Sequence, residues 1–247
     1  MGKFEIGAWV KHSRMQICGR VTEHRGRSAL VRWVGRSKAS PHGTRDLRPS
    51  AAPRAFVLEG SLNPQLHLVR SEEGLLRTWF GSQQMPLAYK NVHALDDIPI
   101  LARAMGAAKP PFVHISCHGD HDRSGRAYIL LAPSNAKRDR IYLNDPGTIG
   151  VFREAFEGMP ILFSACLLGK YQAEMKRFRR EARLGPVAGF TREVHDPETM
   201  LFELLLYQGV LANGWTFQAA VRNACNALLR VCVRGGRGKA QRMARVF

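Results

Sequence analysis

From residue 55 onward, short apolar runs alternate with longer stretches in which apolar and polar residues are mixed. Buried strands are predicted for the apolar runs 56–59, 87–92, 112–116, 127–132, 161–164 and 186–190. Helices are predicted for residues 72–80, 96–105, 151–156, 171–182, 196–211 and 216–231. The sequence Asp196-Pro197 marks one helix start, because proline is well tolerated in the first helical turn. Strands that alternate with helices predict an α/β domain whose mostly parallel sheet is flanked by helices.

Residues 1–49 follow a different pattern, in which short β-rich runs are separated by glycines. This pattern predicts a small all-β unit. The spacing of its glycine, valine and tryptophan residues resembles SH3-like barrels of the Tudor or KOW kind. We expect residues 50–54 to be a linker, residues 55–232 to form the α/β domain and residues 233–247 to form a basic tail.

Two reactive side chains follow directly after predicted strands. His118 and Gly119 come after the run 112–116, and Cys166 comes after the run 161–164. The carboxyl ends of parallel strands meet at one edge of a sheet, so these residues are expected to lie close together. A neighbouring imidazole can convert a cysteine into the nucleophilic thiolate. The backbone N–H groups of Gly119 and Cys166 are candidates for an oxyanion hole.

The order and spacing of this pair resemble those of caspase-type cysteine peptidases. His118 lies 48 positions before Cys166, and caspases have roughly 50 residues between the two. Residues 55–230 are similar to the peptidase domain of the CHAT group, in the caspase–separase clan. The group's His-Gly motif matches 118–119, and its small-Ala-Cys motif matches 164–166. The resemblance implies peptide-bond hydrolysis with Cys166 as nucleophile and His118 as general base and acid, without a metal or cofactor.

The same resemblance implies where a substrate would bind. The position two residues before the nucleophile often contacts the substrate side chain in this clan, and here it is Ser164. Because serine is uncharged, neither the aspartate preference of caspases nor the basic preference of metacaspases carries over. Asp120 is a second candidate for lining the pocket or orienting His118. The family context implies a protein substrate, an activating protein and a role in prokaryotic stress or defence.

The net charge of +17 is the strongest anomaly of composition. Residues 1–55 alone hold 12 basic and 3 acidic residues, so this surface also suits nucleic acid as a partner. Five irregularly spaced cysteines without a C-x-x-C pair argue against a disulfide framework and favour a reducing cytoplasm. The sequence holds no apolar run of about 20 residues, the length that a membrane-spanning helix needs.

Two alternatives remain open. The first is a non-catalytic binding module, in which the basic β unit is fused to a degenerate caspase-like scaffold. The second is metal-dependent hydrolysis, because the segment 116–121 resembles the H-x-H-x-D-H motif of metallo-β-lactamases. In that segment the first ligand position is Ser116, and only His195 is available downstream as a further histidine.

Overall fold

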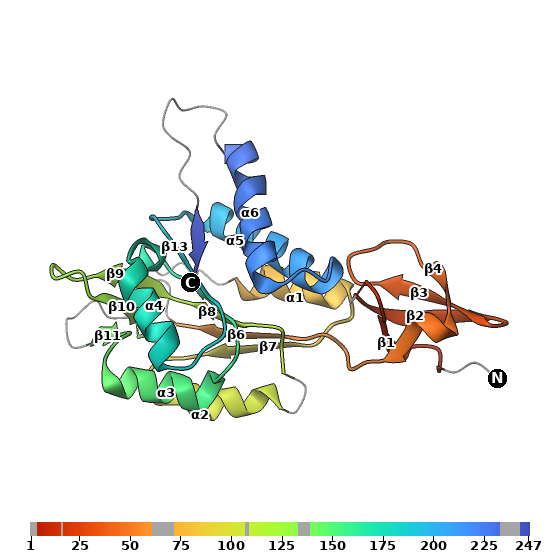
Figure 1. The fold of residues 1–247 in the computed structure, drawn as a ribbon, viewed down its shortest axis with the longest axis horizontal. Coiled ribbons are helices and arrows are strands. Elements are labelled where there is room, and N and C mark those ends of the chain that lie inside the picture. Colours follow the sequence, from red (N-terminus) through yellow and green to blue (C-terminus); the bar gives the residue numbers. More distant parts are fainter. Residues whose placement is uncertain (1–3, 16, 61–71, 107–108, 133–138, 233–242) are drawn as a thin grey trace.

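A computed structural model describes residues 4–15, 17–60, 72–106, 109–132, 139–232 and 243–247. Its centre is a six-stranded sheet with the order β14-β13-β12-β8-β6-β7 (Figure 1). The bounds of these strands are β6 Ala55–Glu59, β7 Leu87–Asn91, β8 Val113–Ser116, β12 Ile161–Ser164, β13 Val187–Phe190 and β14 Ala244–Val246. All neighbouring pairs are parallel except β13 and β14. The prediction of a mostly parallel α/β sheet is therefore confirmed.

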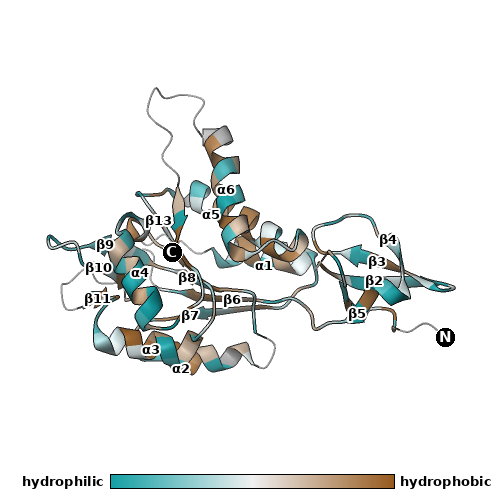
Figure 2. Cartoon of the chain, in the orientation of Figure 1, coloured by the Kyte–Doolittle hydropathy of each residue, from teal (hydrophilic) through white to brown (hydrophobic). Residues whose placement is uncertain are grey.

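Helices cover both faces of this sheet (Figure 1). One face packs against α2 (Asp97–Ala102), α3 (Pro146–Phe156) and α4 (Gln172–Glu181). The other face packs against α1 (Glu73–Ser82), α5 (Asp196–Tyr207) and α6 (Phe217–Cys232). A 3₁₀ turn at Arg103–Met105 continues α2, and a π-helical segment at Gln208–Ala212 continues α5. The helices are hydrophobic toward the sheet and hydrophilic toward solvent (Figure 2), as amphipathic surface helices must be.

The alternation of side chains along β8 divides its residues between the two faces. Val113 and Ile115 belong to the core under α2, α3 and α4. His114 points the other way, where it meets Tyr207 of α5. This two-residue period fixes which polar side chains of the strand can reach the α5 side of the sheet.

A second, smaller sheet continues from β8 and was only partly anticipated. It holds β9 (His118–His121), β10 (Ala127–Leu130) and β11 (Ile141–Tyr142), all antiparallel. The sequence predicts that the strand 112–116 breaks into a loop at His118, because the apolar run ends there. The structure instead pairs this segment with the buried strand β10, from Leu130↔His118 to Ala127↔His121.

The N-terminal unit is a five-stranded antiparallel sheet with the order β4-β3-β2-β1-β5. Its strands are β1 Trp9–His12, β2 Cys18–Arg25, β3 Ser28–Trp33, β4 Ser40–Gly43 and β5 Leu47–Pro49. Val10, Val21, Val31, Trp33 and Leu47 form its own core. Among the described residues no ladder joins β4 to β5, so a closed SH3-like barrel stays a prediction. Residues 50–54 connect it to β6 without helix or strand.

The end of the chain differs from the expected basic tail. Residues 244–246 form the edge strand β14, and Phe247 exchanges two backbone hydrogen bonds with Val187 at 2.8 and 3.3 Å. Met243, Ala244 and Phe247 are buried, so burial of apolar side chains draws this segment back onto the sheet. The rest of the predicted tail, residues 233–242, lies outside the described residues. Within the described chain, every helix is too short or too polar to span a membrane.

Candidate active site

The pairing of β8 with β12 brings the predicted histidine and cysteine to the same edge of the sheet. Ser116 and Ser164 are register partners in this parallel ladder. The N–H of Cys117 donates a hydrogen bond of 3.2 Å to the carbonyl of Ser164 just beyond it. His118 and Cys166 each follow two residues after these paired serines. Both therefore leave the carboxyl edge of the sheet on adjacent strands, the position at which α/β folds gather reactive groups.

Gly119 is a point of close approach between the two segments. A side-chain carbon placed on Gly119 would lie 2.8 Å from the carbonyl oxygen of Cys166 and 2.8 Å from the Cβ of Ala165. The same carbon would lie 3.0 Å from Leu168. The start of β9 thus packs directly on the backbone of the cysteine turn, and only glycine leaves room for this contact.

A tight turn presents Cys166 at the sheet edge. Leu167 adopts a left-handed conformation, with φ 62° and ψ −15°, which costs a non-glycine residue about 1–3 kcal/mol. The N–H of Leu168 donates to the carbonyl of Cys166 at 2.8 Å. Leu168 and Gly169 are buried, and the backbone of Gly169 packs against Gly189 of β13. These anchors hold the turn while Cys166 remains partly exposed.

Two neighbouring cysteines at this edge have opposite environments. Cys117 is 3% exposed, and its side chain belongs to the core under α2, α3 and α4. Burial raises the pKa of its thiol far above the ordinary value, and the nearby Glu72 and Cys166 add to the shift. A thiol in this state is neutral and shielded, so Cys166 is the one of the two that can be attacked or can attack.

Asp120 lies on β9 two residues after His118, which places the two side chains on the same side of the strand. Its carboxylate accepts the N–H of His121 at 2.8 Å and the hydroxyl of Tyr128 at 3.4 Å. The ring of His121 packs on Tyr171, with centroids 4.3 Å apart. The antiparallel partner β10 and Tyr171, which caps the start of α4, thus fix the conformation of the strand that carries His118.

Ser164 is the last residue of β12, and its side chain lies on the face of the sheet that α5 covers. It is 5% exposed, and its hydroxyl donates a 2.5 Å hydrogen bond to the carboxylate of Glu203 on α5. This bond occupies the hydroxyl that the family resemblance assigns to the substrate. The geometry favours a role for Ser164 in joining β12 to α5.

Replacing Ser164 distinguishes a structural role, the bond to α5, from a contact with the substrate. We expect Ser164→Ala to lower the free energy of unfolding by about 1–3 kcal/mol, because the buried carboxylate loses a donor. KM for a cleaved peptide should change by less than about threefold. Chemical denaturation and steady-state kinetics on the same variant measure both quantities. A rise in KM without any loss of stability would instead show a substrate contact.

Sequence reasoning missed a buried polar cluster beneath the sheet edge. Glu72 at the start of α1, His114 on β8 and Glu203 on α5 place their ligand atoms within 4.8 Å of one another. The Nε2 atom of His114 lies 3.2 Å from Glu203 and 3.8 Å from Glu72, and Nδ1 lies 3.3 Å from the hydroxyl of Tyr207. Two sequence signals could have revealed it: a histidine inside an apolar strand, and a lone glutamate within the apolar run 200–207.

The electrostatics of this cluster follow from burial. Desolvation, followed by repulsion from Glu203, raises the pKa of Glu72 to about 8. Desolvation also lowers the pKa of His114. At neutral pH the cluster therefore holds a protonated Glu72 beside a neutral imidazole. One histidine and two carboxylates are also donors that divalent metals accept, but a metal would have to displace this proton.

The shifted pKa values predict how stability depends on pH. The folded state keeps the Glu72 proton up to pH about 8, whereas the unfolded chain releases it near 4.5, so stability falls as pH rises through this window. The lowered pKa of His114 acts in the opposite direction, but only below about 6.5. Between pH 6.5 and 8 we expect a loss of about 2 kcal/mol of unfolding free energy.

Urea denaturation at pH 6.5 and pH 8 tests this expectation. Glu72→Gln cannot ionise, and it should remove most of the pH dependence. The control variant is Glu154→Gln, since Glu154 is exposed on α3 and its replacement should leave the slope unchanged. Equal slopes in all three proteins would contradict a buried, protonated Glu72.

The metallo-β-lactamase alternative requires its motif residues to converge on one ion. In the described residues, Glu72, His114 and Glu203 are the group of three potential ligands that meets this distance requirement, and His118, Asp120 and His121 do not form one. Asp120 and His121 do approach each other, with 3.1 Å between Oδ1 and Nδ1, but among the described residues no third ligand atom joins them within the distance that a shared ion requires.

Comparison with known proteins adds little to this geometry. No protein-family model and no curated protein matches the sequence. Among solved structures, the chain is similar to a secreted C11 cysteine protease from Bacteroides thetaiotaomicron, solved in complex with an irreversible peptide inhibitor. The sequence identity is 11%, the TM-score is 0.46, and the match covers 79% of this chain and 66% of that chain. The chain thus spans slightly less than two thirds of that protease.

Proposed function

We propose that the protein is a cysteine endopeptidase of the caspase-like type, with Cys166 as nucleophile and His118 as general base and acid. The observation that carries the proposal is the register of β8 and β12, which starts both residues from paired positions, Ser116↔Ser164. The close contact of Gly119 with the backbone of Cys166 supports it. A partly exposed thiol at the carboxyl edge of a parallel sheet supplies the accessible nucleophile.

The chemistry assigned to the pair is acyl transfer in two steps. His118 takes the thiol proton, and the thiolate sulfur of Cys166 bonds to the scissile carbonyl carbon. The carbon–nitrogen bond then breaks, and His118 gives the proton to the leaving amine. Water next attacks the thioester, His118 accepts the proton of the water, the carbon–sulfur bond breaks to release the acid, and His118 returns its proton to the sulfur to restore the thiol. The N–H groups of Gly119 and Cys166 are the proposed donors to the oxyanion.

The substrate class that follows is protein. Asp120 remains our candidate for contacting the substrate or for orienting His118, since it shares a side of β9 with that histidine. Ser164 is given no substrate contact in this proposal, because its hydroxyl already donates to Glu203. The resemblance to the CHAT group belongs to the same proposal, as does a place in a cytoplasmic stress or defence response with an activating protein.

The test is the appearance of new protein ends. The protein is incubated with a peptide library prepared from a bacterial proteome, and the amino termini formed are labelled and sequenced by mass spectrometry. We expect cleavages that share a side-chain preference on at least one side of the broken bond. The absence of such cleavages, also after addition of proteins encoded beside this one, would contradict the proposal.

A further inference from the structure

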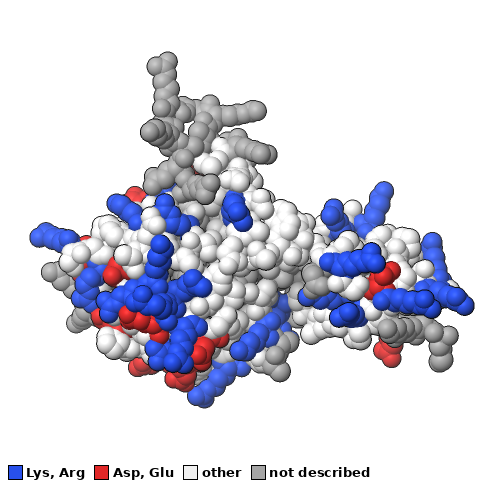
Figure 3. All heavy atoms as spheres, viewed as in Figure 1, with Lys and Arg blue, Asp and Glu red and all other residues white. Residues whose placement is uncertain are grey.

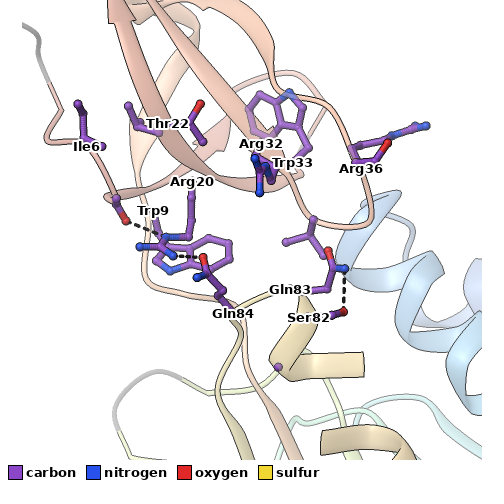
Figure 4. A pocket seen from close by; sticks show the side chains of 15 residues that line it. Ile6, Trp9, Arg20, Thr22, Arg32, Trp33, Arg36, Ser82, Gln83 and Gln84 are labelled. Atoms are coloured by element: carbon purple, nitrogen blue, oxygen red, sulfur yellow. Dashed lines mark hydrogen bonds between the residues drawn. The ribbon is translucent and has the colours of Figure 1, made fainter. Parts of the chain in front are cut away.

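A pocket of about 590 Å³ lies where the N-terminal sheet meets the end of α1 (Figure 4). Its walls come from β1, β2 and β3, from the turn at 34–37 and from residues 81–84. Helix α1 begins near the carboxyl end of β6 and ends before the start of β7. The pocket therefore lies at the end of the central sheet opposite to the carboxyl edge that His118 and Cys166 follow. Figure 1 shows the N-terminal unit at the end of the sheet away from β9. It is distinct from the proposed active site.

The pocket is strongly cationic. Arg20, Arg32 and Arg36 line it, and none of the described residues that line it is acidic. Arg32 and Arg36 are exposed, and within the described part of the chain neither forms an ion pair with a carboxylate. On the face seen in Figure 3, the charged residues of the N-terminal unit are mostly basic. An anionic ligand is the complement of this charge.

Arg20 is held in place for such a ligand. Its Nε donates to the carbonyl of Gly7 at 3.1 Å, and its guanidinium group also bonds the side-chain oxygen of Gln84. The sheet and α1 are joined a second time nearby, where the side chain of Gln83 accepts the N–H of Gly35 at 2.8 Å. These bonds preorganise the pocket, because they fix one cation and the spacing of the two walls.

The remaining lining side chains favour a phosphate-bearing ligand over a peptide carboxylate. Guanidinium groups bind phosphate oxygens through paired hydrogen bonds. Trp9 is only partly buried and lines the same pocket beside the side-chain amide of Gln84 (Figure 4). Thr22 lines the pocket as well, and its hydroxyl donates to the carbonyl of Leu30 at 3.2 Å. An indole face stacks on a base of any sequence, whereas amides and hydroxyls bond base edges. Trp33 also lines the pocket but is buried. Three cations beside one partly exposed aromatic side chain, Trp9, thus match a nucleotide.

We propose that this pocket binds the phosphate and base of a nucleotide, delivered by a single-stranded nucleic acid or as a free nucleotide. Arg20, Arg32 and Arg36 contact the phosphate, and Trp9 packs on the base. This inference does not depend on peptide cleavage, because the pocket and the catalytic pair share no residue.

Binding is measured directly on the full-length chain carrying Cys166→Ala, so that activity plays no part. A fluorescently labelled 12-nucleotide single strand is titrated and followed by anisotropy. We expect the double variant Arg32→Glu/Arg36→Glu to weaken binding at least roughly tenfold and to lower the salt dependence. The matched control is Arg45→Glu/Arg48→Glu, which changes the charge of the same N-terminal unit equally at exposed residues outside the pocket.

Competitors distinguish the source of the ligand. Displacement by unlabelled mononucleotide supports a free nucleotide, and displacement only by unlabelled oligonucleotide supports a nucleic-acid strand. Displacement by polyglutamate at equal charge would overturn the proposal in favour of an acidic peptide. Equal weakening by both double variants, or no binding at about 100 µM protein, would overturn it as well. Circular dichroism spectra of all variants verify that they fold.

Discussion

Replacing Cys166 with alanine is expected to abolish the cleavage of peptides, with kcat/KM falling by a factor on the order of 10⁴ or more. The sulfur of Cys166 is the atom that bonds to the carbonyl carbon of the substrate, so no neighbouring group can replace it as the nucleophile. The fold should be preserved, because Cys166 is partly exposed in a turn that is anchored by Leu168 and Gly169. Mass spectrometry of the cleaved peptide library measures the loss.

His118→Ala should cause a loss of similar size, and the double variant should be scarcely worse than either single one. Two residues that act as one unit give strongly non-additive effects. The matched control is Cys117→Ala, which removes the adjacent thiol from the apolar core. That variant should lose stability but keep most of its activity. Full activity in Cys166→Ala, or loss of activity only in Cys117→Ala, would refute the assignment.

Gly119→Val is expected to reduce activity at least roughly 100-fold, since misplacement of a catalytic group by about 1 Å has an effect of this size. The new side chain would start only 2.8 Å from the carbonyl oxygen of Cys166 and 2.8 Å from Ala165. It must push β9, with His118, away from the cysteine turn. The same overpacking should reduce stability by about 1–3 kcal/mol. Kinetics and urea denaturation measure the two effects.

Gly150→Ala provides the matched control for this substitution. Gly150 lies within α3, and an added side-chain carbon would meet nothing within 4 Å. Alanine is the better helix former by about 1 kcal/mol, so this variant should be as active as the wild type and slightly more stable. If Gly119→Val were equally active, His118 and Cys166 would not need the close approach of their segments.

The elements that the sequence predicts well are those whose own residues determine them. The apolar runs of β6, β8, β12 and β13 mark buried strands whatever surrounds them. Pro197 correctly marks the start of α5, whose N-cap is His195. The equivalent signal at Asp145-Pro146 also begins a helix, α3, which the predicted start at residue 151 places too late. Local patterns thus suffice where burial or helix-start chemistry is strong.

The elements that the sequence misses depend on distant partners. The polar segment 118–121 becomes a strand only because β10 pairs with it. Residues 244–246 follow a run rich in glycine and arginine, and their strand depends on the free edge of β13. The cluster of Glu72, His114 and Glu203 joins three residues that are far apart in the sequence. Single-residue signals exist for two of them, but only the packing of α1 and α5 on β8 reveals that they meet.

The reactivity of the individual thiols tests the central claim most directly. The protein is treated with iodoacetamide in limiting amount, and the alkylation rate of each cysteine is followed by peptide mass spectrometry in the wild type and in His118→Ala. Cys18 is the internal reference, since it is also partly exposed. We predict that Cys166 reacts fastest in the wild type and slows toward the rate of Cys18 in His118→Ala. An alkylation rate of Cys166 that does not exceed that of Cys18, or that is the same in His118→Ala as in the wild type, would contradict the claim that His118 activates Cys166.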